Sequence, residues 1–108
     1  MTRLSQRLLA CAVLAAAAGA AQAAEHLVSQ KGRAFSKSAI SIKPGDKVVF
    51  RNDDPFVHNI FSLADANPFD LGSYAQGQSK DVVFTKEGKF DVECAIHPEM
   101  KMTVTVAK

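Results

Sequence analysis

Apolar and polar residues alternate along several short runs of this chain, and turn-forming residues separate the runs. In the run from Phe90 to Cys94, every second residue is apolar and the residues between them are acidic. Because successive side chains of a β-strand point to opposite faces, this pattern predicts a strand that buries one face. Comparable runs lie at 27–30, 39–42, 47–51, 57–62, 80–85 and 102–106. About seven or eight short strands without helical periodicity predict an all-β fold, an antiparallel sandwich of two sheets.

Two segments between these runs are predicted to leave the sheets. Proline and glycine in the segment 43–46 favour a tight turn, in which glycine supplies a positive φ. The segment 63–79 is rich in Ala, Asp, Asn, Pro and Gly and loses the alternation. We therefore predict a long loop there, with room for one helical turn, packed onto the core through Phe69, Leu71 and Tyr74.

The chain begins with the pattern of a secretory signal peptide. Two arginines precede an apolar run at 8–20, and small residues follow at 21–23. The apolar run is too short to span a bilayer. We therefore predict that 1–23 is cleaved and that the protein is exported to the periplasm, with no membrane span in the mature chain.

Cleavage leaves one small domain, 24–108, whose charges balance. Arg3 and Arg7 are lost, so 11 of the 13 Lys and Arg remain beside 11 Asp and Glu. This balance disfavours nucleic-acid binding, which calls for a basic patch or stripe. Cys11 is lost as well, so Cys94 becomes an unpaired thiol in an oxidising compartment. Such a thiol needs a use, and metal binding is one.

Three residues with metal-binding side chains share one short segment near the end of the chain: Cys94, His97 and Met100. His58 lies far upstream in an apolar run. Two imidazoles, a thiolate and a thioether form the ligand set of a trigonal copper site with a weak axial methionine. Structural zinc sites instead collect four Cys or His ligands. The sequence therefore predicts one copper ion per chain at these four residues.

The same residues carry a resemblance to the cupredoxins, and most closely to their amicyanin and plastocyanin branch. The matching features are His58-Asn59, the Cys94-x-x-His97-x-x-Met100 loop, Pro98, Phe90 before Cys94, Pro44-Gly45-Asp46 and Phe50-x-Asn52. The loop has the amicyanin length. The resemblance implies a Greek-key sandwich with a type 1 copper at one end. It also implies a monomeric one-electron carrier, not an enzyme, cycling between Cu(II) and Cu(I).

The resemblance also implies roles for single residues. His97 is the exposed ligand, and redox partner proteins dock on the apolar surface around it. Candidates for that surface are Pro55, Phe56, Pro68, Phe69 and Pro98. Met102 competes with Met100 as the axial ligand because it has the plastocyanin-like spacing from His97. The register of the final strand favours Met100.

Two positions depart from the family pattern. Ala95 stands where the family usually has Ser or Thr, so the hydroxyl bridge to Asn59 must be absent or replaced by backbone. Ile96 stands where proline is common, so its amide is a candidate donor to the Cys94 sulfur. Away from the loop, the Asp53-Asp54 pair is expected in a solvated turn and His26 on the surface.

Two other functions use the same residues. A copper-binding protein for tolerance or delivery needs the same four ligands but releases its metal to an acceptor. A nucleophilic Cys94 with His97 as its base is the weaker alternative, because the thiol lies on the buried face of its strand and Met100 is left without a role.

Overall fold

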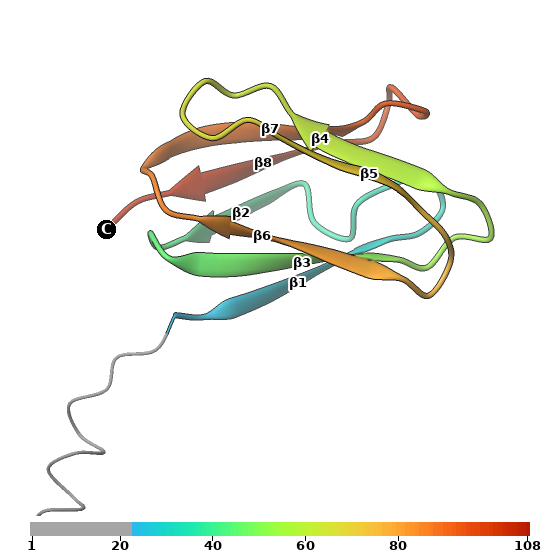
Figure 1. Ribbon diagram of the computed structural model, residues 1–108, viewed down its shortest axis with the longest axis horizontal. Coiled ribbons are helices and arrows are strands. Elements are labelled where there is room, and N and C mark those ends of the chain that lie inside the picture. Colours follow the sequence, from blue (N-terminus) through green and yellow to red (C-terminus); the bar gives the residue numbers. More distant parts are fainter. Residues whose placement is uncertain (1–22) are drawn as a thin grey trace, which may run out of the picture.

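The computed structural model describes residues 23–108, which form two β-sheets packed face to face (Figure 1). The strands are β1 (Glu25–Gln30), β2 (Ala39–Ile42), β3 (Asp46–Asn52), β4 (His58–Ser62), β5 (Phe69–Tyr74), β6 (Ser79–Phe84), β7 (Gly88–Cys94) and β8 (Lys101–Val106). One sheet has the order β1-β3-β6 and the other β2-β8-β7-β4-β5. The predicted two-sheet sandwich is confirmed. The predicted signal peptide, apart from Ala23, lies outside the described residues.

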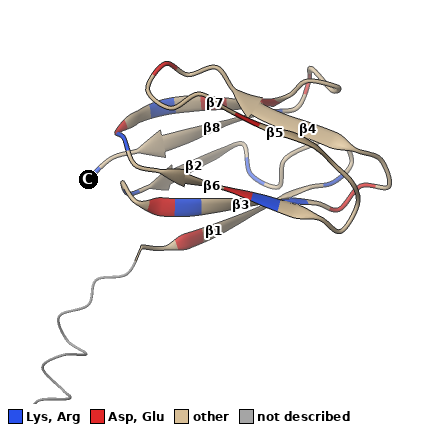
Figure 2. Ribbon diagram, viewed as in Figure 1, with Lys and Arg blue, Asp and Glu red and all other residues tan. Residues whose placement is uncertain are grey.

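The strand pairs β3–β6, β4–β5, β4–β7 and β7–β8 are antiparallel, whereas β1–β3 and β2–β8 are parallel. The sheets are therefore mixed, not uniformly antiparallel as predicted. A parallel pair needs a crossover connection, and β2 in the opposite sheet lies within the connection from β1 to β3. Residues 23–108 include no helix long and apolar enough to cross a membrane. Acidic and basic residues are interspersed over the strands (Figure 2).

The prediction of a loop at 63–79 was wrong in the middle of this segment, where β5 forms. This strand pairs with β4 through an irregular register between Asn59 and Phe61. Gly72 has a φ of 69° and its amide donates to the Asp70 side chain at 2.8 Å. Asp and Gly are depleted in strands, and a glycine with positive φ is typical of a β-bulge. The strand was missed because pairing with β4 overrides the low β-propensity of its sequence.

The core between the sheets is filled by the apolar face of each strand. Phe84 is fully buried, and the centroid of its ring lies 5.9 Å from that of Phe69 and 5.2 Å from that of Phe90. Phe90, Val92 and Cys94 are all buried, as their alternation predicted. The same face of β7 that fills the core therefore carries the Cys94 thiol to the end of the sandwich.

The turn predicted at 43–46 is present and encloses a buried carboxylate. Gly45 has a φ of 94°, and the Asp46 amide donates to the Lys43 carbonyl at 3.0 Å. The Asp46 side chain lies 3.0 Å from His26 Nε2 and accepts the amides of Ala24 and Lys43. His26 is thus partly buried, with 28 % of its side chain exposed, and not a free surface residue. The bond with His26, followed by the two amides, lowers the pKa of Asp46 to about 2.

We expect Asp46→Asn to lower the free energy of unfolding at neutral pH. In this variant, the free energy of unfolding should also fall less steeply as the pH is lowered into the acid range. Because the folded state holds the pKa of Asp46 below 3.8, its carboxylate stabilises the fold above that pH. This contribution disappears as the pH falls toward about 2. Urea unfolding of the metal-free protein from about pH 7 to pH 2 checks this. Asp81→Asn, at a carboxylate whose side chain is 57 % exposed, is the control and should keep the acid dependence.

Candidate metal centre

The strand pairing brings the sequence-predicted ligands to one end of the sandwich. β4 runs antiparallel to β7 with Ile60 opposite Cys94, so the start of β4 lies beside the end of β7. His58 is the first residue of β4, and His97 lies in the loop between β7 and β8. In Figure 1 this loop lies at the upper right, at the end opposite the C-terminus. The pairing of β4 with β7 thus brings together His58 and Cys94, which are 36 positions apart in the sequence.

Three donor atoms converge at this end. Cys94 Sγ lies 3.6 Å from His58 Nδ1 and 3.7 Å from His97 Nδ1. The three donors lie within 4.8 Å of one another. Bonds of about 2.0 Å to nitrogen and 2.3 Å to sulfur place donors of one ion about 3.5–3.8 Å apart, at angles between tetrahedral and trigonal. The spacing therefore suits a single metal ion held by one sulfur and two nitrogens.

The donors differ in their access to solvent. His58 is fully buried and Cys94 is 2 % exposed, whereas His97 is half-buried. The Met100 amide donates to the His97 carbonyl at 2.9 Å, which closes the loop tightly. His97 is thus the candidate ligand that reaches the surface, as predicted.

Both methionines of the loop and β8 are buried, at 1 % exposure for Met100 and 3 % for Met102. In the β7–β8 register, Met102 pairs with Val92 and Lys101 with Glu93. One further step along the same register brings Met100 level with Cys94, so Met102 lies two residues deeper in the sheet. Strand register thus favours Met100, and not Met102, as the methionine nearer the Cys94 thiol.

Backbone groups link the two ligand-bearing segments. The Asn59 amide lies 3.5 Å from Cys94 Sγ, and the Ala95 amide donates to the Asn59 carbonyl at 2.9 Å. This backbone bond replaces the hydroxyl bridge that Ala95 cannot form, and Asn59 Oδ1 is buried without a partner. Among the described residues, Asn59 supplies the backbone N–H that reaches the sulfur. The bond predicted from the Ile96 amide is not formed.

Asp54 was missed as part of the site. The prediction of a solvated turn was wrong for this residue, which is 3 % exposed and whose Oδ2 lies 2.8 Å from His58 Nε2. Burial raises the pKa of Asp54, but hydrogen bonds from His58 and from the amides of Gly32 and Arg33 outweigh it and hold the pKa below its usual value. The available signal was weak: an acid following Asn52 in a loop, four residues before a histidine.

Phe56 covers the histidines from one side. Its ring centroid lies 5.4 Å from that of His58 and 5.2 Å from that of His97, and the Arg33 guanidinium lies 5.5 Å from it. The prediction that Phe56 borders His97 is confirmed. Phe69 packs against the core, next to Phe50 and Phe84. Of its two predicted roles, packing of the segment 63–79 is therefore confirmed, and the role in the surface around His97 was wrong.

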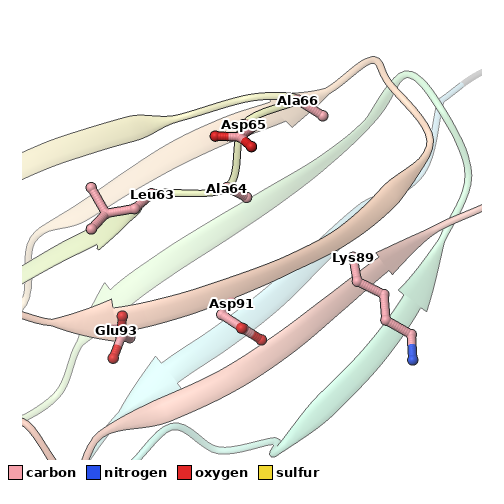
Figure 3. Close-up of a pocket in the computed structure, with 7 residues that line it drawn as sticks. All are labelled: Leu63, Ala64, Asp65, Ala66, Lys89, Asp91 and Glu93. Atoms are coloured by element: carbon pink, nitrogen blue, oxygen red, sulfur yellow. The ribbon is translucent and has the colours of Figure 1, made fainter.

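A hollow lies on the outer side of β7, away from the metal centre, and Figure 3 shows its lining. The residues are Leu63, Ala64, Asp65, Ala66, Lys89, Asp91 and Glu93. It contains no histidine or cysteine and lies beside the middle of the sheet. The soft donors gather only at the end of the sandwich in the described part of the chain.

The sequence matches the family of copper binding proteins that includes plastocyanin and azurin, over residues 22–107. The chain therefore belongs to this cupredoxin family. It is 33 % identical over 93 residues to chloroplastic plastocyanin from Silene latifolia subsp. alba, covering 74 % of this chain and 56 % of that protein. It is 29 % identical over 80 residues to plastocyanin from Lactuca sativa, covering 64 % and 81 %. The chain thus spans little more than half of the Silene protein.

Solved structures show the same fold. A reduced amicyanin variant superposes with a TM-score of 0.72 at 26 % identity, covering 84 % of this chain and 89 % of that one. The Cu-containing nitrite reductase NirK from Thermus scotoductus SA-01 gives 0.74 at 26 % identity, covering 82 % and 24 %. A purple cupredoxin from Nitrosopumilus maritimus superposes with a TM-score of 0.67 at 24 % identity, covering 76 % of this chain and 99 % of that one, and supports the fold alone.

Membership of the copper-binding family confirms the predicted copper cofactor, and the sulfur and nitrogen donors of the site suit copper.

Proposed function

We propose that this protein is an exported one-electron carrier whose copper ion is held by His58, Cys94 and His97, with Met100 as the axial ligand. The observation that carries the proposal is the convergence of one sulfur and two Nδ1 atoms in a buried site from which one imidazole reaches the surface. Bound copper supplies the Cu(II)/Cu(I) couple. The mixture of soft thiolate and thioether with imidazole suits both oxidation states.

The chain contributes a ligand geometry that changes little between oxidation states. His58 and Cys94 are buried on paired strands, and the Asn59–Ala95 backbone bond fixes their separation. Close packing around Met100 excludes water. Four protein ligands leave no open position for a substrate, which supports a carrier and not an enzyme.

The surface around His97 supports electron exchange through a brief contact. Phe56 packs on His97, and Ile96 and Val57 are 48 % and 44 % exposed. A small, wet contact of this kind is typical of short-lived redox complexes. We propose that soluble redox proteins dock here with the copper protein as a monomer in the periplasm, after cleavage of 1–23.

Electron self-exchange in mixtures of the oxidised and reduced protein, measured by NMR line broadening, tests this function. We expect fast exchange in the wild type and a reduction of about tenfold in Ile96→Asp, because two like charges then meet in each encounter. Leu63→Asp is the matched control, 77 % exposed but in the hollow beside β7, and should exchange at the wild-type rate. Slow exchange together with ready transfer of Cu(I) to a competing thiol peptide would instead indicate copper delivery.

A further inference from the structure

The Asp54 carboxylate contacts the buried candidate ligand His58 on the ring nitrogen that is not near Cys94. Its Nε2 lies 2.8 Å from Asp54 Oδ2, and its Nδ1 lies 3.6 Å from Cys94 Sγ. A carboxylate only accepts hydrogen bonds, so Nε2 carries the proton in this contact. Nδ1, on the side of Cys94, is then the ring nitrogen left to bind a metal ion. The contact thus selects the tautomer that can bind copper.

A tight turn between β1 and β2 holds this carboxylate in place. Gly32 and Arg33 have φ values of 64° and 56°, and the Lys31 amide donates to the Ala34 carbonyl at 3.0 Å. The Gly32 amide donates to Asp54 Oδ1 at 2.7 Å and the Arg33 amide to Oδ2 at 3.2 Å. Two successive amides in such a turn make a binding site for an anion. A positive φ at a non-glycine residue is uncommon, and here it aims an amide at Asp54.

The loop that carries Asp54 is fixed from its other side by Asn52, which is fully buried. Asn52 Oδ1 accepts the Asp54 amide at 2.8 Å, and Asn52 Nδ2 donates to the carbonyls of Phe56 and Tyr74 at 2.8 and 3.0 Å. Asp54 is therefore bound by its main chain and by both carboxylate oxygens. Because the Asp54 carboxylate is held in this way, it fixes the orientation of the His58 ring with which it is hydrogen-bonded.

We propose that Asp54 is the positioning residue of the copper site, which orients His58 and, through its negative charge, lowers the reduction potential. This inference rests on the proposed function of the site. A hydrogen bond from the second ring nitrogen to a carboxylate fixes the ring and raises its basicity as a ligand. A buried negative charge interacts more strongly with Cu(II) than with Cu(I), because the doubly charged ion gains more Coulomb energy in a medium of low dielectric.

The test is the reduction potential of the copper-loaded Asp54→Asn protein. We expect the ratio of Cu(II) to Cu(I) affinity to fall at least about tenfold, which raises the potential of a one-electron couple by about 59 mV. Asp53→Asn is the matched control: its carboxylate is adjacent, 32 % exposed and paired with Arg51 at 3.0 Å, and the potential should stay near the wild-type value. Asp54→Glu keeps the charge and should restore most of the lower potential. Equal shifts in the Asp53 and Asp54 variants would overturn the proposal.

Two further readouts separate this inference from the function on which it rests. In the metal-free wild type, nitrogen-15 NMR should show His58 protonated at Nε2, and protonation at Nδ1 alone would contradict the orienting role. Asp54→Ser is a second uncharged variant, to be used if Asp54→Asn does not fold. A wild-type potential in Asp54→Ser would contradict the electrostatic role.

If an uncharged Asp54 variant keeps the copper–thiolate absorption and the wild-type potential, the inference fails and the carrier function stands. If the wild type itself lacks that absorption, the function fails first.

Discussion

Replacing Cys94 with serine should abolish the intense visible absorption of the copper-loaded protein. That absorption arises from charge transfer between a thiolate and Cu(II), and Cys94 is the free cysteine of the described chain. Serine has nearly the same shape, but its hydroxyl stays protonated at neutral pH and is a poor ligand for copper. Loss of partners outside the ligand set already costs about 10–100-fold in metal affinity, so loss of the thiolate should cost at least about 100-fold.

Absorption spectra and copper titrations of the two purified proteins check this result. His26→Asn is the control, because it removes a histidine that pairs with Asp46 away from the metal centre. That variant should keep the full absorption and one copper per chain. A visible band of wild-type intensity in Cys94→Ser would show that the copper binds elsewhere.

Phe84→Ala should lower the free energy of unfolding of the metal-free protein by about 3–5 kcal/mol. The side chain is fully buried, and its ring packs against Phe69 from β5 and Phe90 from β7, so truncation leaves a cavity between the two sheets. Small domains are stable by about 5–15 kcal/mol, so this one change removes a large fraction of the total.

Denaturant unfolding measures the effect. Val83→Ala is the matched control: it neighbours Phe84 on β6, points outward and is 49 % exposed, so its effect should stay near 0.5 kcal/mol. A loss for Phe84→Ala below about 1 kcal/mol would mean that the sheets repack around the missing ring, contrary to close packing between them.

Much of the architecture follows from local pattern. Alternation in the run from Phe90 to Cys94 determines which face of β7 is buried, and therefore that the thiol faces inward. The ligand types alone indicated copper, and the spacing of Cys94, His97 and Met100 indicated that the segment after β7 could supply ligands. These features were predictable because each depends on residues close together in the chain.

Other features depend on contacts between distant segments. β5 forms through pairing with β4, although Asp70 and Gly72 disfavour a strand. Asp54 looks like a solvated turn residue in the sequence, and its burial depends on amides of Gly32 and Arg33, 22 and 21 positions away. No local pattern reports that contact. The contact that orients His58 therefore became evident only from the structure, in which the turn at Gly32 and Arg33 lies beside the loop that carries Asp54.

The most direct test of copper binding at His58, Cys94 and His97 is a crystal structure of the Cu(II)-loaded mature protein, with anomalous diffraction recorded at the copper edge. We expect one anomalous peak among His58 Nδ1, Cys94 Sγ and His97 Nδ1, the donors that already lie within 4.8 Å of one another. Its nearest sulfur beyond Cys94 should belong to Met100. A peak elsewhere, for example between His26 and Asp46, or none in fully loaded crystals, would contradict the assignment.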